Sequence, residues 1–285
     1  MFLSSLYRDI DWLKLAMILS LLSFNGAVFA DTDKPMRIGL NSDRHYPPFS
    51  WSNKCDENKP LGVPLDIAGA ALARLGIDYQ WLVQEVGGQS TAFLFEQTGV
   101  NKLDAKMLPG LRGDDFLLRV SEPVYLMSMN VFVRVENQKS LSELSALSDR
   151  KGIYLVEKES PSFRLLRAKH ADALSGLSVN GDLDEVVDLL QKGEIDYFIT
   201  DRSVGRVYLV ERNLTNKVVR SAVDLDVNIP LYLYISKKSP YASRVADISK
   251  ELLRLNSSGE SAFLMRQNML QWLVLSRSRN CSVEY

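Results

Sequence analysis

Short apolar stretches of strand length alternate along the chain with longer stretches whose apolar residues recur at helical spacing. Ile77, Tyr79, Trp81 and Val83 stand at alternate positions, which is the period of a half-buried strand. The expected strands are 36–40, 77–83, 105–108, 130–135, 153–156, a stretch ending at 201, and 229–235. The expected helices begin at 66, 140, 160 and 182 and also cover 241–255 and 260–273. This alternation predicts an α/β fold with mainly parallel sheets.

Capping signals set the expected ends of these helices. Asp66 precedes one apolar helical face and Gly76 follows it, while Asp182 and Gly193 bracket a second helix in the same way. Residues 140–143 read Ser-Leu-Ser-Glu, the spacing of a capping box, so a helix is expected to begin there. We therefore interpret Asp66 as a helix cap and not as a ligand contact.

The first thirty residues have the three-part layout of a secretory signal peptide. Arg8 and Lys14 precede the apolar run 15–22, and small residues at 27–30 precede a polar start at Asp31. The apolar run is shorter than the roughly 20 residues that a membrane-spanning helix needs, which disfavours a permanent anchor. We expect cleavage after residue 30 and a periplasmic product in a bacterium with two membranes. No lipid anchor is expected, because the residue directly after the cleavage site is Asp31 and not a cysteine.

Composition narrows the chemistry that is expected of the mature chain. The formal net charge is −1, which implies no nucleic-acid partner. Cys55 and Cys281 are the only cysteines, and in an oxidising compartment such a pair forms either a disulfide or, less often, part of a metal site. His45 and His170 are the only histidines, so few residues are present that could form a histidine metal site or a Ser-His-Asp triad. We expect no metal, no cofactor and no catalytic residue.

The stretch 193–201 carries the strongest functional signal. It ends an apolar strand on the carboxylate of Asp201, and ligands of open α/β sheets bind at the carboxyl ends of such strands. A carboxylate there suits a cationic group such as an ammonium. The alternative is an aspartate in a solvated loop.

Five short motifs follow one another along the chain: Tyr46-Pro47-Pro48-Phe49, Gly62-Val63-Pro64-Leu65-Asp66-Ile67-Ala68, Lys102-Leu103-Asp104-Ala105, Ser121-Glu122-Pro123-Val124-Tyr125, and Gly193-Glu194-Ile195-Asp196 with Asp201. Taken together in this order, they resemble the family 3 solute-binding proteins, the amino-acid-binding proteins of bacterial ABC importers. The resemblance covers nearly the whole mature chain.

The resemblance implies a two-lobed periplasmic binding protein fold of type II, with two mainly parallel sheets joined by two hinge strands. One lobe would comprise residues 31–132 and 232–285, and the other 133–231. Such a protein is expected to be a monomer that closes on a small polar solute, an amino acid or a relative, and delivers it to a membrane ABC permease.

The resemblance also implies the ligand contacts. Arg112 would hold an α-carboxylate through two parallel donors, helped by its loop and by amides at a helix start in the other lobe. Asp201 would bind the ammonium, and two aromatic residues would wall the pocket. The implied ligand-binding residues are Tyr46, Phe49, Leu108, Gly110, Arg112, Ser160, Ser162 and Asp201.

The chain departs from the family pattern in the loop that carries the arginine. Arg112 follows Asp104 after only eight positions, and an alignment anchored on Ser121 puts Asp114 in its place. We favour Arg112, because a shift of two residues in a loop can leave so long a side chain within reach. The charged residues 157–159 replace a small glycine-containing turn, where they either narrow the pocket or face water.

Further aromatic residues have structural alternatives. Trp51 is either a pocket wall or part of the core, Trp81 is assigned to the core, and Tyr125 is expected to pack under the hinge.

Two other functions stay open beside transport. Periplasmic dehydratases acting on prephenate or arogenate resemble the same family, and they need a proton donor at a leaving hydroxyl. Only Asp43, His45, Glu157 and Glu159 lie near the expected cleft, and none stands out. A sensing protein whose closed form contacts a membrane receptor is the other alternative.

Overall fold

The computed structural model describes residues 35–40, 48–49, 51–53, 56–83, 92–96, 117–155 and 161–277. The expected signal peptide, the strand expected at 105–108, and both cysteines lie outside these residues. Within the described segments, no helix combines the length and the apolar character needed to cross a membrane.

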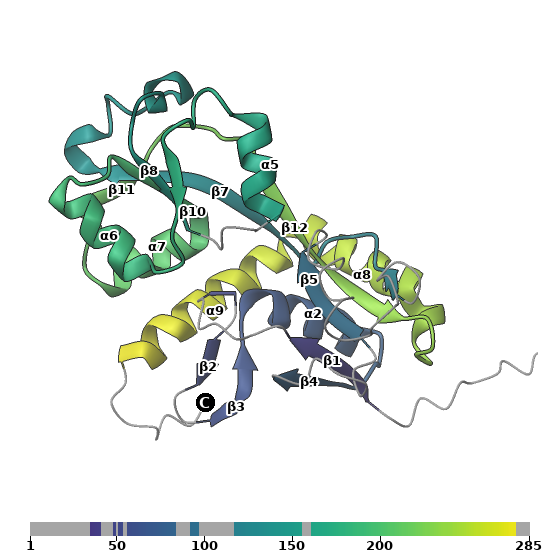
Figure 1. The fold of residues 1–285 in the computed structure, drawn as a ribbon. Coiled ribbons are helices and arrows are strands. Elements are labelled where there is room, and N and C mark those ends of the chain that lie inside the picture. The colour runs from purple at the N-terminus through teal and green to yellow at the C-terminus, as the bar shows by residue number, and fades with distance from the viewer. Residues whose placement is uncertain are drawn as a thin grey trace, which may run out of the picture. The chain divides into compact units, whose positions relative to one another are not determined.

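One end of the main sheet is built around β1 (Met36–Leu40), which pairs in parallel with β4 (Tyr79–Val83) and β5 (Ala92–Glu96). β5 then pairs antiparallel with β12 (Asn228–Ser236), which also pairs with the short β6 (Leu117–Arg119). This end therefore combines a strand from early in the chain with one from late in the chain (Figure 1).

The other end of the sheet is built around β7 (Tyr125–Arg134). The first part of β7 pairs antiparallel with β12, and its second part with β10 (Tyr197–Asp201) and β11 (Val218–Arg220). β10 pairs in parallel with β8 (Gly152–Tyr154), and β8 pairs in parallel with β9 (Leu177–Val179). The two ends are thus parallel, as expected, whereas the two long strands that connect them add antiparallel pairs in the middle.

Helices flank both ends of this sheet (Figure 1). A two-stranded hairpin of β2 (Trp51–Asn53) and β3 (Asp56–Leu61) precedes the first of them. The helices are α2 (Val63–Arg74), α5 (Pro161–Lys169), α6 (Leu183–Lys192), α7 (Arg202–Glu211), α8 (Val245–Ser257) and α9 (Glu260–Arg277), with 3-10 turns η1 (Val135–Asn137), η2 (Leu144–Leu147) and η3 (Ala242–Arg244).

Separate hydrophobic cores stabilise the two ends. Met36 and Ile38 of β1 are fully buried against α2 and α8. At the other end, alternate residues of β10 serve opposite faces: Phe198 packs with the α6 and α7 side, and Ile199 with the α5 side. Since strand side chains alternate in direction, this one buried strand contributes to the hydrophobic clusters on both faces of its end of the sheet.

Most of the expected elements are confirmed. The strands expected at 36–40, 77–83, 130–135, 153–156 and 229–235 and the strand ending at Asp201 correspond to β1, β4, β7, β8, β12 and β10. Asp182 caps α6 by accepting a hydrogen bond from the Glu185 backbone N–H at 3.1 Å, and Gly193 ends that helix with a φ of 78°. These signals succeed because they act between near neighbours in the chain.

The expectation that Asp66 caps a helix was wrong. α2 begins at Val63, with Gly62 in the capping position, so that Asp66 lies within the first turn. Val63 and Leu65 are buried, and this tertiary packing extends the helix beyond the point that capping chemistry suggested. Asp66 instead accepts a hydrogen bond from Asn268 at 2.6 Å, and burial raises the pKa of its carboxyl.

The capping box at 140–143 was also a wrong prediction. Only the 3-10 turn η2 follows it, and no side chain caps that turn. The hydroxyls of Ser140 and Ser142 donate to the carbonyls of Asn137 and Lys139, both at 3.0 Å. Serine hydroxyls that bond backward to the preceding turn compete with helix formation in this way.

We predict that Gly205→Ala destabilises the protein. Alanine inside a helix normally stabilises it by about 0.5–1 kcal/mol relative to glycine. A Cβ at residue 205, however, would lie 2.2 Å from Cζ of the buried Phe132, whose ring stacks on Phe198 and cannot easily move. We expect the free energy of unfolding to fall by about 1–3 kcal/mol in urea titrations.

A double variant controls for this clash. In a Phe132→Leu background the same alanine should cost less, because the smaller side chain leaves room for it. A stabilising effect of Gly205→Ala in the wild-type background would contradict the packing of α7 on β7.

Candidate functional site

Asp201 is the last residue of β10 and the capping residue of α7. All five residues of this strand are buried, and Asp201 is 1% exposed. The alternative of a solvated loop aspartate is therefore excluded. An apolar strand brings the carboxylate inside the protein, and the following helix begins immediately at Arg202.

Three backbone N–H groups bind the Asp201 carboxylate. Oδ1 accepts from Ser203 at 2.6 Å and from Val204 at 3.2 Å, both in the first turn of α7. Oδ2 accepts from Ser128 of β7 at 2.9 Å. The side chain therefore ties together β10, α7 and the long strand β7.

The charge of Asp201 has no cationic partner among the described residues; backbone amides and the positive end of a helix dipole stabilise it instead. Burial raises the pKa of its carboxyl from 3.8 to about 6, although the hydrogen bonds from Ser203, Val204 and Ser128 act in the opposite direction. A cation placed beside a buried carboxyl of this kind strongly stabilises its ionised form.

Tyr125 connects Asp201 to a second residue of the expected site, Phe49. The Tyr125 hydroxyl lies 3.2 Å from Ser203 Oγ and donates to Met265 Sδ at 3.6 Å. Its ring packs edge-on against Phe49 with centroids 4.9 Å apart. Burial, and next the charge of Asp201, raise the pKa of Tyr125 to about 12, so that the hydroxyl keeps its proton at neutral pH.

The other expected site residues are placed as follows. Phe49 is 7% exposed, and Ser162 lies in the first turn of α5. Tyr46, Leu108, Gly110, Arg112 and Ser160 lie outside the described residues, as do Asp114 and residues 157–159. The structure thus brings Phe49 and Asp201 into one cluster, through Tyr125 and Ser203, and the other contacts stay predictions.

The two tryptophans singled out in the sequence both pack against hydrophobic clusters. Trp51 is 3% exposed, lies edge-on to Trp272 with centroids 5.1 Å apart, and donates to Asn268 at 3.3 Å. It therefore belongs to a core. Trp81 is partly buried and packs against the first core, in agreement with its assignment.

Sequence reasoning missed Ser128 and Ser203. An aspartate directly after a buried strand and just before a helix is a recognisable capping pattern, which points to the N–H of Ser203. Nothing in the sequence points to Ser128, because it contributes a backbone N–H that any residue except proline could supply.

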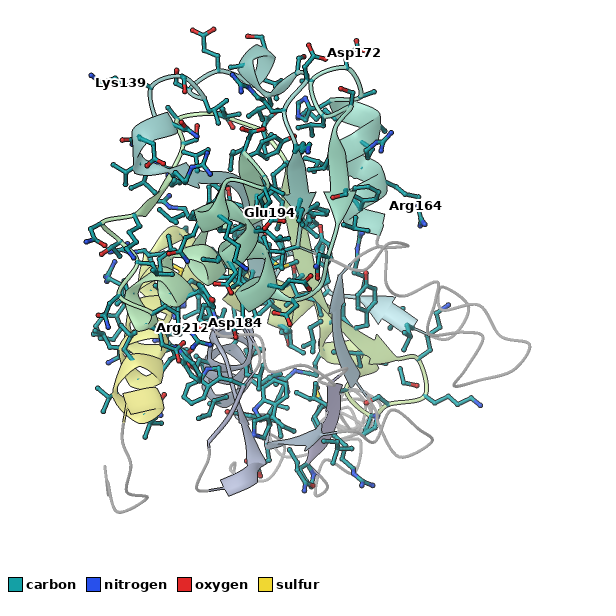
Figure 2. The ribbon with its side chains drawn as sticks, turned by 60° about the vertical axis from the view of Figure 1, so that its left-hand side comes forward. Lys139, Arg164, Asp172, Asp184, Glu194 and Arg212 are labelled. Carbon is teal, nitrogen blue, oxygen red and sulfur yellow. The ribbon has the colours of Figure 1, made fainter. Side chains whose placement is uncertain are left out.

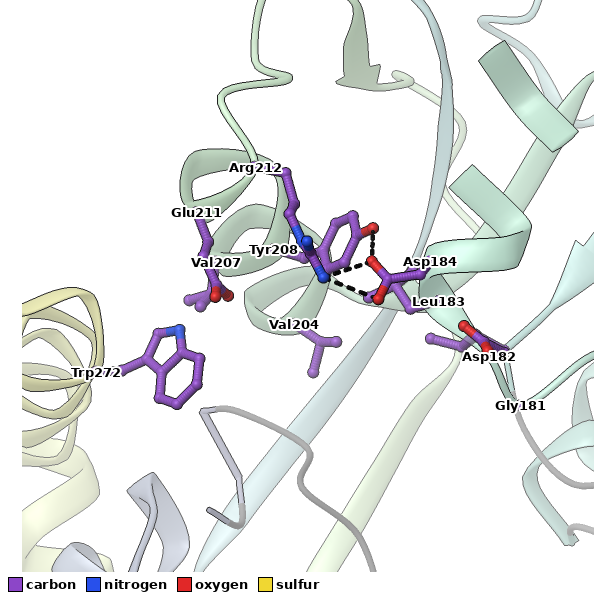
Figure 3. A pocket seen from close by; sticks show the side chains of 11 residues that line it. Gly181, Asp182, Leu183, Asp184, Val204, Val207, Tyr208, Glu211, Arg212 and Trp272 are labelled. Carbon is purple, nitrogen blue, oxygen red and sulfur yellow. Dashed lines mark hydrogen bonds and ion pairs between the residues drawn. The ribbon is translucent and has the colours of Figure 1, made fainter. Parts of the chain in front are cut away.

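A pocket of about 450 Å³ lies beside this cluster, between the start of α6, α7 and Trp272 of α9 (Figure 3). Asp184 accepts hydrogen bonds there from the Tyr208 hydroxyl at 2.5 Å and from Arg212 at 2.8 Å. Figure 2 shows Asp184 and Arg212 side by side. The pocket is lined by Leu155, Gly181, Asp182, Leu183, Asp184, Val204, Val207, Tyr208, Glu211, Arg212 and Trp272.

The described residues hold no group of three or more His, Cys, Asp or Glu side chains that could bind a metal ion. His170, the one histidine among them, lies with Nε2 2.6 Å from the carbonyl oxygen of Leu225.

No family model matches the chain, and no curated protein does either. Solved structures do match its fold. The ligand-binding core of GluR0 in complex with L-glutamate is 13% identical, with a TM-score of 0.58, over 83% of this chain and 98% of that one. An amino acid ABC transporter substrate-binding protein from Streptococcus pneumoniae bound to L-arginine is 17% identical, with a TM-score of 0.57, over 84% and 95%.

A histidine kinase sensor domain with similarity to periplasmic binding proteins is also similar, with 16% identity and a TM-score of 0.55 over 82% of this chain and 95% of that one. At such identities the likeness establishes the fold alone. The chain has the α/β, two-lobed fold of the type II periplasmic binding proteins, as expected from its sequence.

We predict that Asp201 makes the protein less stable as pH rises from about 4 to about 6. In this range the unfolded chain has lost the proton that the folded carboxyl, with its pKa near 6, still holds. The free energy of unfolding should therefore fall by about 3 kcal/mol relative to Asp201→Asn, which cannot ionise. Urea unfolding of both proteins between pH 4 and pH 7 measures this difference, and parallel pH curves would contradict it.

Proposed function

We propose that this protein binds a small solute carrying an ammonium group, an amino acid or a close relative, and delivers it to a membrane ABC permease. One observation carries the proposal. Asp201 is a buried carboxylate without a cationic partner among the described residues, at the carboxyl end of a strand, where folds of this class bind ligands.

Electrostatics favours an ammonium at this position. Isolated burial of a carboxylate is costly, and the pKa of about 6 reports that cost. A ligand ammonium beside Asp201 would offset it, while the backbone N–H groups of Ser128, Ser203 and Val204 hold the carboxylate in place. Because Asp201 must be ionised to bind a cation, we expect affinity to fall as pH drops below about 6.

We propose that a ligand carboxylate is held at the other end of the site. Arg112 would supply two parallel donors, supported by its loop at Leu108 and Gly110, and the start of α5 at Ser160 and Ser162 would supply backbone amides and a favourable helix dipole. Tyr46 and Phe49 would wall the pocket, and the packing of Phe49 on Tyr125 supports a rigid wall there.

The proposed mechanism is hinge closure between lobes comprising residues 31–132 with 232–285, and 133–231. The ligand stabilises the closed form because only that form makes both sets of contacts. β7 and β12, which run between the two ends of the sheet, support the assignment of the hinge. Residues 1–30 would direct export to the periplasm, where the protein acts as a monomer without cofactor or catalysis.

A second function is favoured by one finding. A histidine kinase sensor domain shares the fold, which supports a role in which the closed protein contacts a membrane receptor in place of a permease. The two functions share the ligand site and differ only in the partner of the closed form.

We predict that one α-amino acid stabilises the protein in a thermal-shift screen that also includes polyamines, small carboxylates and prephenate. At 100 times Kd, binding adds about 2.7 kcal/mol, or about 5–10 °C in the melting temperature. Asp201→Asn should abolish this shift. Asparagine still accepts the capping bonds of Ser203 and Val204 through Oδ1 and removes the buried charge, but its Nδ2 cannot accept from Ser128, so the stability of the ligand-free variant is measured beside the shift.

Asp172→Asn is the matched control, since Asp172 is exposed at the surface (Figure 2) and should leave binding unchanged. Wild-type affinity in Asp201→Asn would contradict the assignment of the ammonium site. A response to prephenate alone, with turnover, would favour a dehydratase.

We predict that Arg112→Ala weakens binding of the amino acid found in the screen by about 10- to 100-fold, the range expected for lost charge-assisted hydrogen bonds. Binding of the corresponding amine, which lacks the carboxylate, should not change. Arg112→Lys should restore only part of the affinity, because lysine lacks the paired donors. Isothermal titration calorimetry measures both ligands. Unchanged amino-acid affinity in Arg112→Ala would support the alignment that puts Asp114 in its place.

A further inference from the structure

We propose that the pocket between α6, α7 and α9 is a second ligand site, which takes a small organic cation with an apolar body, such as a primary amine on a ring. This site is separate from the ammonium site at Asp201 and does not depend on the function proposed above.

The pocket has the size and the walls of a small-molecule site. Its volume of about 450 Å³ falls within the roughly 300–1,000 Å³ that is usual for such sites. Leu155, Val204, Val207 and Trp272 line it, and each is at most 4% exposed and anchored in a core. The three aliphatic walls lie in one proposed lobe and are therefore preformed and apolar, while the indole of Trp272, from the other proposed lobe, offers a ring on which a ligand can stack.

The polar groups of the pocket favour a cation. Three carboxylates, those of Asp182, Asp184 and Glu211, face a single guanidinium. Arg212 is already engaged, since it donates to Asp184 at 2.8 Å and lies 5.5 Å from the centre of the Tyr208 ring. An incoming anion would therefore meet no free positive side chain among the described residues that line the pocket.

Glu211 is the residue that would bind the ligand cation. Asp184 is held by Arg212 and Tyr208, and Asp182 caps α6. The carboxylate of Glu211, by contrast, has no hydrogen bond or ion pair with another described side chain, and it projects from α7 at the pocket (Figure 3). It can approach a ligand without breaking an existing contact.

The start of α6 opposes a cation, but its effect is the smaller one. A helix N-terminus carries the equivalent of roughly half a positive charge, against a surplus of two carboxylates over guanidinium in this pocket. The capping carboxylate of Asp182 lies directly at that terminus and offsets much of its charge. The side chains that line the pocket therefore carry a net negative charge.

The second site adjoins the first without sharing its charged group. The backbone N–H of Val204 donates to Asp201, whereas its side chain lines the pocket. Asp201 itself does not line the pocket. Variants at Asp201 and Glu211 should therefore separate the two sites.

The test measures binding of 2-phenylethylamine to the purified protein at pH 7 by calorimetry, with 2-phenylethanol and phenylacetate as uncharged and anionic analogues. We expect only the amine to bind, and we expect Glu211→Gln to weaken it by about tenfold, as for the loss of one charge-assisted contact. Glu211→Lys should abolish binding. Glu194→Gln, at an exposed glutamate outside the pocket, is the matched control and should have no effect.

Asp201→Asn assigns the amine to one site or the other, and it should leave amine binding intact. Loss of amine binding in Asp201→Asn with retention in Glu211→Lys would overturn the proposal, because the amine would then occupy the first site. No binding of the amine, or equal binding of the alcohol, would overturn it as well.

Discussion

The carboxylate of Asp201 is bound by backbone N–H groups from two elements that are far apart in the chain. Ser128 belongs to the long strand β7, and Ser203 and Val204 lie in the first turn of α7. Because this carboxylate is almost fully buried, it must accept those bonds or pay a large desolvation cost. The position of the first turn of α7 against β7 and β10 therefore depends on these backbone hydrogen bonds.

Strands β7 and β12 supply the frame in which that interaction occurs. They pair with each other over residues 125–128 and 228–231, and each then pairs with a different set of strands. Antiparallel pairing in the middle of the sheet follows from this exchange, and parallel pairing returns at both ends. Ser128 lies where β7 leaves β12, so the backbone group that reaches Asp201 sits at the crossing itself.

The two proposed sites lie on either side of the first turn of α7 and use different chemistry. At Asp201 the carboxylate is buried and hydrogen-bonded by backbone amides, so a ligand ammonium would supply the opposite charge beside it. In the pocket the walls are apolar, and Glu211 remains available at the rim. The first turn of α7 thus binds the Asp201 carboxylate through backbone N–H groups and lines the pocket through the side chain of Val204.

The sequence by itself determined those features that arise between near neighbours. Strand and helix positions followed from periodicity, and the ends of α6 followed from Asp182 and Gly193, since capping bonds span three or four residues. The resemblance to solute-binding proteins led to the two-lobed fold, and Asp201 stood out because it ends an apolar strand.

Only the tertiary structure decided the environment of these residues. Asp66 is not a cap because buried neighbours start α2 earlier, and Trp51 is core because Trp272 lies against it. The burial of Asp201 depends on Ser128, and the pocket on Trp272, both distant from α7 in the sequence. The burial of a side chain and the charges around it depend on groups that folding brings together from distant parts of the chain. The local sequence pattern does not indicate which groups these are.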